Sequence, residues 1–185
     1  MLCSYEYMKT FSITGIVLKR VNVGETDRIV TLFTKERGKI ACVAKGVRKL
    51  SSSKLAVLEP GCEARIYCVE TKSLPILTQA QLLNDFHHSK QTLPSVKKMF
   101  QILETIDALL FEEDVQENVY TLVHSLLTHI DAGQTTSVDT IRETLRTIIS
   151  LLGFEGTTPN QSIMELIEEL TAKKMKSFEY LTVGN

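Results

Sequence analysis

With 185 residues, of which 43% are hydrophobic and 23% charged, the chain has an ordinary globular composition, and this excludes wholesale disorder. No run approaches the roughly 18–20 apolar residues of a membrane-spanning helix, and residues 1–7 lack the basic and apolar regions of a secretory signal. We therefore expect a cytoplasmic protein. In that compartment the four cysteines (Cys3, Cys42, Cys62 and Cys68) are expected to be reduced and mostly buried.

The net charge of −1 conceals an asymmetry between the two halves of the chain. Residues 1–84 hold 13 Lys and Arg against 7 Asp and Glu, a balance of +6. The remaining residues hold 8 Lys and Arg against 15 Asp and Glu, a balance of −7. This split predicts two parts with different partners, the first suited to a polyanion.

Five short strands are predicted in the first half, from segments rich in β-branched residues that are separated by turn-forming residues. They cover residues 13–18, 28–33, 39–44, 64–69 and 77–82. One long loop separates the third strand from the fourth. This pattern suits a small closed barrel such as an OB-fold, because closure removes the exposed edges of the strands.

Apolar residues change to helical spacing from Pro94 onward, which predicts four helices. The first runs from Pro94 to about Leu110, and Asp114 with Glu117 is expected to cap the second, which ends near residues 131–133. The third begins at about Ser137 and stops at Gly153. Residues 158–161 (Thr-Pro-Asn-Gln) are expected to open a last helix that continues to about Lys174. Val115 and Val138 are expected on buried helix faces.

The sequence therefore predicts an α+β protein, in which an N-terminal five-stranded OB-fold barrel precedes an all-α helical domain. The expected domains are residues 1–84, with an ordered core of about 9–84, and residues 85–185. The first is the expected DNA-binding domain.

The strongest candidate for a binding site is the segment of residues 45–54, here called the basic loop. It holds four cations, one glycine and three serines in ten residues. Such a loop can follow a phosphate backbone, since cations neutralise phosphates and hydroxyls donate hydrogen bonds. A solvated, flexible loop is the alternative. Basic residues in neighbouring strands and turns favour nucleic acid: Lys19, Arg20, Arg28, Lys35, Arg37 and Lys39.

Other features are weaker. Phe11, Phe33 and Tyr67 could support bases on a barrel face, although a core position is expected for Phe33. The histidines lack the i, i+4 spacing of a metal site on a helix. No phosphate-binding motif and no nucleophile with a partnering base can be identified, so we expect neither a cofactor nor catalysis.

Five segments stand in an order and spacing that resembles the N-terminal domain of the bacterial RecO DNA repair proteins, over about residues 12–84. They are Thr14-Gly15-Ile16-Val17-Leu18, Gly24-Glu25-Thr26-Asp27, Thr34-Lys35-Glu36-Arg37-Gly38-Lys39, Ala44-Lys45-Gly46-Val47-Arg48-Lys49 with Ser51, and Leu58-Glu59-Pro60. Across the rest, the resemblance consists mainly of the helical pattern and Leu151-Leu152-Gly153-Phe154.

The resemblance implies a recombination mediator of the RecF pathway. Such a protein binds single- and double-stranded DNA, anneals complementary strands and, with RecR, helps to displace single-strand-binding protein so that RecA can load. The tail of single-strand-binding protein is then an expected partner. The matching DNA-binding residues are Lys35, Arg37, Lys39, Lys45, Arg48 and Lys49, and charge alone adds Arg28 and Lys54.

Two departures from the family pattern are visible. Many members carry a four-cysteine zinc module after the Leu-Gly-aromatic stretch, but this chain has no cysteine beyond Cys68, so we expect a short form without zinc. Members also tend to begin close to the first strand, which makes Met8 the expected start. A protein-interaction adaptor, with the barrel as a mere scaffold, is the alternative function.

Overall fold

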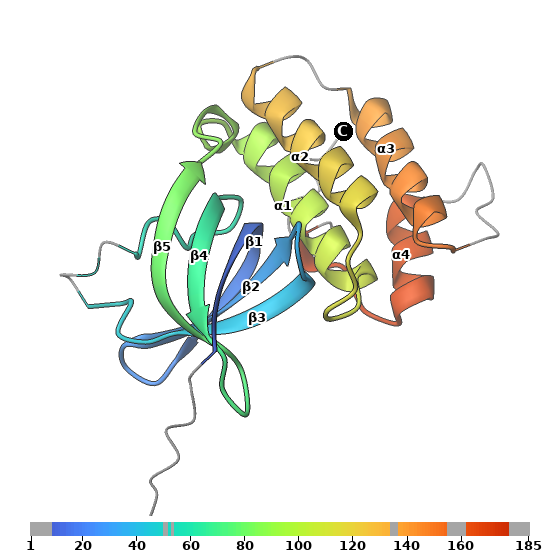
Figure 1. Cartoon of the computed structure of the whole chain (residues 1–185). Helices are drawn as coiled ribbons and strands as arrows, with labels where there is room; N and C mark the ends of the chain where they lie inside the picture. Colours follow the sequence, from blue (N-terminus) through green and yellow to red (C-terminus); the bar gives the residue numbers. More distant parts are fainter. Residues whose placement is uncertain (1–8, 50–51, 53, 134–136, 155–161, 178–185) are drawn as a thin grey trace, which may run out of the picture.

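The computed structural model describes residues 9–49, 52, 54–133, 137–154 and 162–177. A β-barrel lies beside a layer of helices (Figure 1). The strands, in chain order, are β1 (Thr10–Val23), β2 (Asp27–Thr34), β3 (Gly38–Ala44), β4 (Glu63–Val69) and β5 (Ile76–Asn84). They form a closed barrel in the order β1-β2-β3-β5-β4, which confirms the predicted fold class.

The long first strand, β1, is central to the barrel because it pairs with two neighbouring strands. Its residues 10–16 pair with β4 and residues 15–23 pair with β2, with an irregularity in register between Val17 and Lys19. The barrel closes between β3 and β5 through one parallel pair, Val43 with Ile76. Inward side chains such as Val17, Leu32 and Ile66 are fully buried and form the barrel core.

Four α-helices follow a short 3₁₀ turn (His88–Lys90): α1 (Leu93–Leu109), α2 (Glu117–Asp131), α3 (Val138–Leu151) and α4 (Ile163–Thr171). The hydroxyl of Ser137 accepts a hydrogen bond from the Thr140 amide (3.0 Å), which caps α3 where the sequence predicts its start. Among the described helices, none is long and apolar enough to cross a membrane.

Three details of the helical prediction are wrong. Asp114 does not cap α2; Gln116 precedes the helix without a side-chain cap, and its side-chain amide Nε2 donates a hydrogen bond to the Asp114 carboxylate instead (2.9 Å). Val115 and Val138 are 51% and 54% exposed, because they lie before α2 and at the first position of α3, outside the packed stripes. Helix α4 ends at Thr171, short of Lys174. Residues 158–161 lie outside the described ranges.

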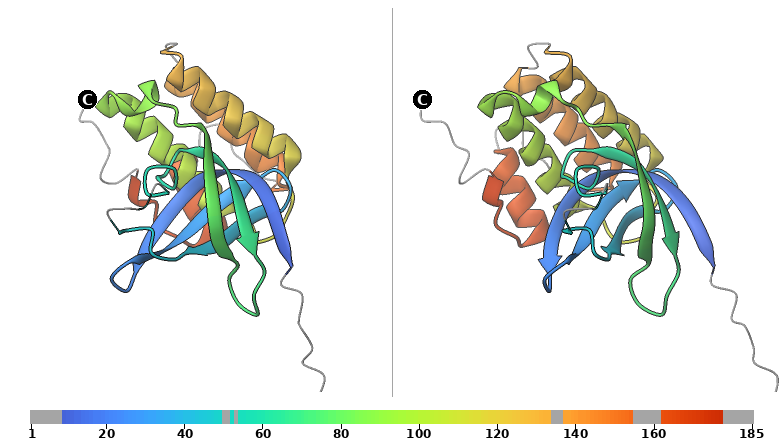
Figure 2. Two further views of the ribbon diagram at one scale, coloured as in Figure 1. Left: turned by 60° about the vertical axis from the view of Figure 1, so that its left-hand side comes forward. Right: turned by 90° about the vertical axis from the view of Figure 1, so that its left-hand side faces the viewer.

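The helices pack against one side of the barrel, which we call the covered wall (Figures 1 and 2). Three outward barrel residues, Ile16, Leu18 and Phe33, belong to the same buried cluster as the helix residues. The Phe33 ring meets Tyr120 of α2 edge-on at 5.3 Å. β5 ends at Asn84, the expected domain boundary, but the buried cluster includes residues on both sides of it.

Polar contacts complete this junction. The Tyr120 hydroxyl donates to the Glu63 carboxylate at the start of β4 (2.8 Å). Burial, together with this carboxylate, raises the pKa of the Tyr120 phenol above its ordinary value. The phenol therefore stays protonated and remains a donor. Cys42, Cys62 and Cys68 are buried free thiols, as expected, whereas Cys3 lies outside the described residues.

Candidate nucleic-acid interface

The first part of the basic loop is held against the β1–β2 turn by hydrogen bonds. The Asp27 carboxylate accepts from the Gly46 amide (2.7 Å), and the Arg48 amide donates to the Thr26 carbonyl (3.0 Å). Val47 is fully buried in the barrel core. Residues 45–49 are therefore held by hydrogen bonds and one buried side chain. Residues 50, 51 and 53 of the loop lie outside the described ranges.

This anchoring presents three cations to solvent. The side chains of Lys45, Arg48 and Lys49 are exposed. The segment that follows β3 lies on the opposite side of the barrel from α3 and α4 (Figure 1). The Arg48 guanidinium also donates to the Gly24 carbonyl (3.1 Å). Hydrogen bonds from the Gly46 amide and the Thr26 hydroxyl, together with the nearby charges of Lys45 and Lys49, hold the pKa of Asp27 below its usual value.

Three further predicted residues have partners but remain partly accessible. The Lys54 ammonium donates to the Thr78 carbonyl of β5 (3.1 Å). Lys35 is 53% exposed and lies 3.6 Å from the Glu117 carboxylate. Arg37 lies 3.1 Å from the Glu70 carboxylate, and its guanidinium stacks over the Phe11 ring at 4.3 Å. They can approach a phosphate only by giving up part of these contacts.

Arg28 and Lys39 have internal partners. The Arg28 side chain is 8% exposed; it bonds the Glu59 carboxylate and the Asn22 side chain, each at 3.0 Å. Lys39 is 12% exposed and donates to the Asp107 carbonyl (2.7 Å). Burial lowers the pKa of Lys39, and the Asp107 carboxylate opposes this effect. Both side chains are largely buried and held by internal partners, so neither presents an exposed charge as Lys45, Arg48 and Lys49 do.

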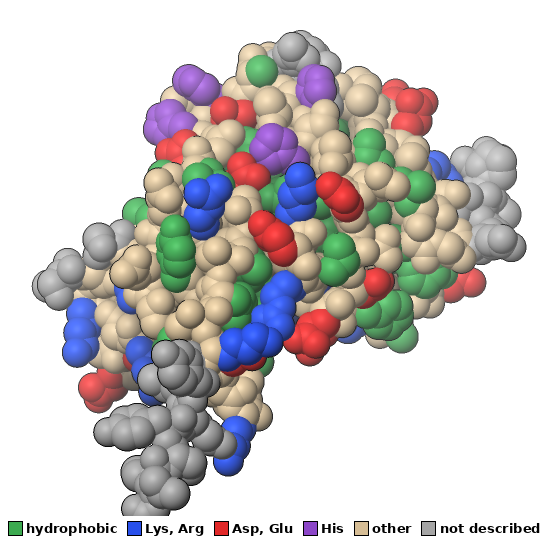
Figure 3. All heavy atoms as spheres, in the orientation of Figure 1, with side chains coloured by type: hydrophobic (Ala, Val, Ile, Leu, Met, Phe, Trp, Pro, Cys, Tyr) green, Lys and Arg blue, Asp and Glu red, His purple; other side chains and the backbone are tan. Residues whose placement is uncertain are grey.

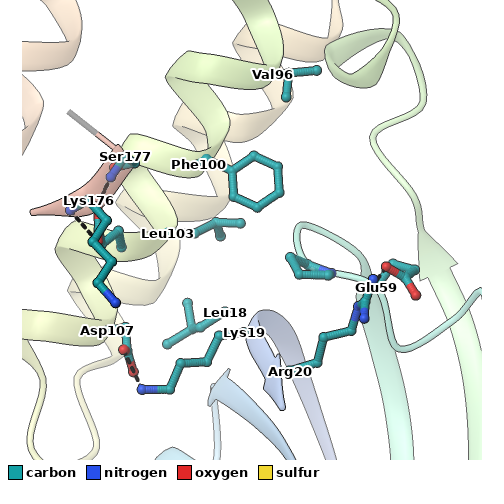
Figure 4. A pocket seen from close by; sticks show the side chains of 12 residues that line it. Leu18, Lys19, Arg20, Glu59, Val96, Phe100, Leu103, Asp107, Lys176 and Ser177 are labelled. Carbon is teal, nitrogen blue, oxygen red and sulfur yellow. Dashed lines mark hydrogen bonds and ion pairs between the residues drawn. The ribbon is translucent and has the colours of Figure 1, made fainter. Parts of the chain in front are cut away.

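Two other cations that the sequence placed near the site lie in a groove of about 700 Å³ between the barrel and α1 (Figure 4). Lys19 pairs with Asp107 (2.6 Å), and Arg20 pairs with Glu59 (2.8 Å). Apolar side chains such as Phe100 line most of the rest of it, together with Glu104, Lys176 and Ser177. The carboxylates neutralise the cations, so this groove offers no net positive charge to a polyanion.

The eight predicted residues are thus divided by the structure. Three gather on the anchored part of the basic loop, three have surface partners, and two are internal. The internal pairs escaped sequence reasoning because the partners lie far apart along the chain, 31 residues for Arg28 with Glu59 and 68 for Lys39 with Asp107. The distribution of charges along the sequence shows where cations occur, but it does not show which carboxylate each cation pairs with in the folded chain.

In the face shown in Figure 3, most of the Lys and Arg side chains lie over the barrel, whereas Asp and Glu side chains are spread over the barrel and the helices. Phe33 has the core position expected for it and is fully buried. Among the described residues, no three His, Cys, Asp or Glu side chains gather in a way that could hold a metal ion.

Comparison with known proteins gives a consistent result. Residues 8–86 match the family model "Recombination protein O N terminal". Relatives named DNA repair protein RecO include those of Salinibacter ruber (35% identity; 65% of this chain and 47% of the relative), Myxococcus xanthus (30%; 69% and 52%) and Thermoanaerobacter sp. (31%; 80% and 59%). The chain spans about half the length of the curated relatives it matches.

Proposed function

This chain belongs to the RecO family, and from that premise we propose that it is a non-enzymatic DNA repair protein that binds DNA through its barrel. One observation carries the proposal. Residues 45–49 of the basic loop are held by hydrogen bonds while Lys45, Arg48 and Lys49 remain exposed, whereas the cations of the covered wall have carboxylate partners. An anchored cluster of exposed cations suits a phosphate backbone.

The proposed mechanism is charge neutralisation. Two complementary single strands repel each other through their phosphates, and cations at the end of the barrel lower this repulsion so that the strands can pair. The family resemblance extends the proposal to the RecF pathway: annealing of strands, displacement of single-strand-binding protein together with RecR, and loading of RecA. The helical part (residues 85–185) has a formal charge balance of −7, which makes it more suitable for protein partners than for DNA.

Fluorescence anisotropy of labelled single- and double-stranded DNA, measured against salt, tests the proposal. Contacts with roughly six phosphates give a log–log salt slope of about −4 on single strands. Changing Lys45, Arg48 and Lys49 together to Ala is expected to weaken binding to both DNA forms. It should also reduce the magnitude of the single-strand slope by about 2.

A matched control removes the same charge from the helical part. Arg142, Lys173 and Lys174 are exposed and are changed together to Ala. This variant is expected to keep wild-type affinity and slope. Equal losses in both triple variants would show a nonspecific charge effect and contradict the assignment to the loop. No binding by the wild type would reject DNA binding and favour the adaptor.

A further inference from the structure

A second part of the barrel carries side chains that have no partner among the described residues. β1, β4 and β5 lie side by side and direct two rows of mostly exposed side chains outward, in the register Ser12–Tyr67–Gln79 and Thr14–Arg65–Gln81. We call these six residues the open wall. The intervening residues, among them Ile13 and Ile66, point into the barrel core. In Figure 1, β4 and β5 lie on the opposite side of the barrel from α3 and α4.

The chemistry of the open wall differs from that of the covered wall. Within the described ranges, the side chains of Arg65, Tyr67 and Gln79 take part in no hydrogen bond or ion pair, although the backbone carbonyl of Tyr67 accepts one from Thr78. These three side chains therefore offer one cation, one aromatic ring and one amide that can both donate and accept. These are groups that recognise the edges and faces of nucleobases.

Two hollows adjoin Tyr67. One, of about 330 Å³, is lined by Ser12, Ile13, Thr14, Glu36, Arg65 and Tyr67. The other, of about 390 Å³, is lined by Thr10, Phe11, Ser12, Tyr67, Cys68, Thr78 and Gln79. Both volumes fall at the lower end of the roughly 300–1,000 Å³ that small-molecule sites occupy. The Tyr67 ring thus has space beside it for a flat group.

Tyr67 is better suited to stacking than its neighbour Phe11. The Arg37 guanidinium stacks over the Phe11 ring, whereas Tyr67 is 39% exposed. Glu36 lines one hollow as a carboxylate, and it accepts a hydrogen bond from the Thr14 amide (2.9 Å). A carboxylate at such a position repels phosphate but can accept from the amino group of a base. Bases, and not backbone, therefore suit this wall.

The open wall is continuous with the basic loop. The register of β4 with β5 shifts between Tyr67 and Cys68, and the extra residue of β5 is Thr78. Its hydroxyl donates to the Tyr67 carbonyl (3.0 Å), and its own carbonyl accepts from the Lys54 ammonium (3.1 Å). Thr78 thus connects the last cation of the loop with the wall of the second hollow.

We propose that the open wall is a base-stacking surface for single-stranded DNA, on which the Tyr67 ring stacks against a base while Arg65 and Gln79 contact base edges. The inference rests on the proposed function, because the basic loop is taken to hold the phosphates of the same strand. A duplex cannot use the open wall in this way, since its bases are stacked within the helix. The wall therefore confers a preference for single strands that the loop alone lacks.

The absence of tryptophan from the chain gives a direct test. Tyr67→Trp places a single indole at the proposed stacking position, and Phe111→Trp places one at a residue that is 70% exposed in the α1–α2 connection. Unlabelled oligothymidylate is expected to quench the fluorescence of the first variant and leave that of the second unchanged. A duplex of equal phosphate concentration should quench neither. Equal quenching of the first variant by duplex, or none by the oligonucleotide, would overturn the proposal.

Binding measurements separate this inference from the proposed function. Tyr67→Ala is expected to weaken single-strand binding about fivefold or more while leaving duplex affinity unchanged, and Tyr67→Phe should stay within about twofold of wild type. The Lys45, Arg48 and Lys49 triple variant loses affinity for both forms. If Tyr67→Ala binds single strands as the wild type does while the triple variant does not, the stacking surface is rejected and the DNA-binding loop stands. If the wild type binds neither form, both fail.

Discussion

The covered wall and the open wall belong to one barrel, yet their polar side chains have opposite surroundings. On and beside the covered wall, Lys19, Arg20, Arg28 and Lys39 are matched with carboxylates from the long loop and α1. On the open wall, Arg65 has no such partner among the described residues. The same residue types thus stabilise the fold in one region and remain available to a ligand in the other.

A count of cations alone is therefore a poor guide to a binding surface. Burial is expensive for a charge unless a partner compensates it, so a buried cation indicates a structural pair. An exposed cation on an anchored backbone costs little to keep available. Position relative to the helical layer, more than number, therefore separates the two roles in this molecule.

The largest difference between the two walls is expected when one aromatic ring is removed from each. Phe33 is fully buried between barrel and helices, so Phe33→Ala should lower the free energy of unfolding by about 3–5 kcal/mol through lost burial and the resulting cavity. Tyr67→Ala should cost at most about 1 kcal/mol, because its ring is partly solvated. Urea unfolding measures both, and similar losses would contradict the distinction between the walls.

A smaller effect is expected from two arginines. Arg28→Met removes the donor to Glu59 and Asn22, but Arg20 remains paired with Glu59, so a loss of about 2 kcal/mol in unfolding free energy is expected. Arg48→Met removes an exposed side chain and should cost less than about 1 kcal/mol.

DNA affinity should follow the reverse order for the two arginine variants. Arg48→Met is expected to weaken binding in the anisotropy assay, while Arg28→Met, assayed well below its unfolding temperature, should retain the wild-type value. If fully folded Arg28→Met bound DNA more weakly than the wild type, Arg28 would belong to the interface, and the distinction between paired and exposed cations would be contradicted. Thermal unfolding followed by circular dichroism supplies the control for folding.

Much of the fold could be predicted from local patterns. β3 and β4 alternate buried and accessible residues along most of their length, and this period of two is visible in the sequence. The start of α3 at Ser137 is likewise a local signal. Val138 shows the limit of such signals, since its exposure depends on how the first turn of α3 faces the rest of the molecule.

The candidate site could be predicted only in part, for a physical reason. The exposed cations of the basic loop follow one another in sequence, so composition finds them. The partners that remove Arg28 and Lys39 from the surface come from Glu59 and Asp107, and only the folded chain brings them together. The rows of the open wall also require three strands in register, which no single segment reveals.

The smallest expected effect concerns the anchor of the basic loop, Asp27. Its pKa is lowered in the folded protein, chiefly by the hydrogen bond from the Gly46 amide. The ionised form is therefore favoured by folding, and its contribution to stability is fully present above the unfolded value of about 3.9. That contribution is lost as pH falls through the lower folded pKa.

In Asp27→Asn the side-chain oxygen can still accept from Gly46, but it no longer titrates. Urea unfolding of both proteins between pH 7 and pH 2.5 should therefore show the wild type more stable at neutral pH and the difference shrinking below pH 4. A difference that stays constant across this range would show that the charge of Asp27 does not stabilise the loop.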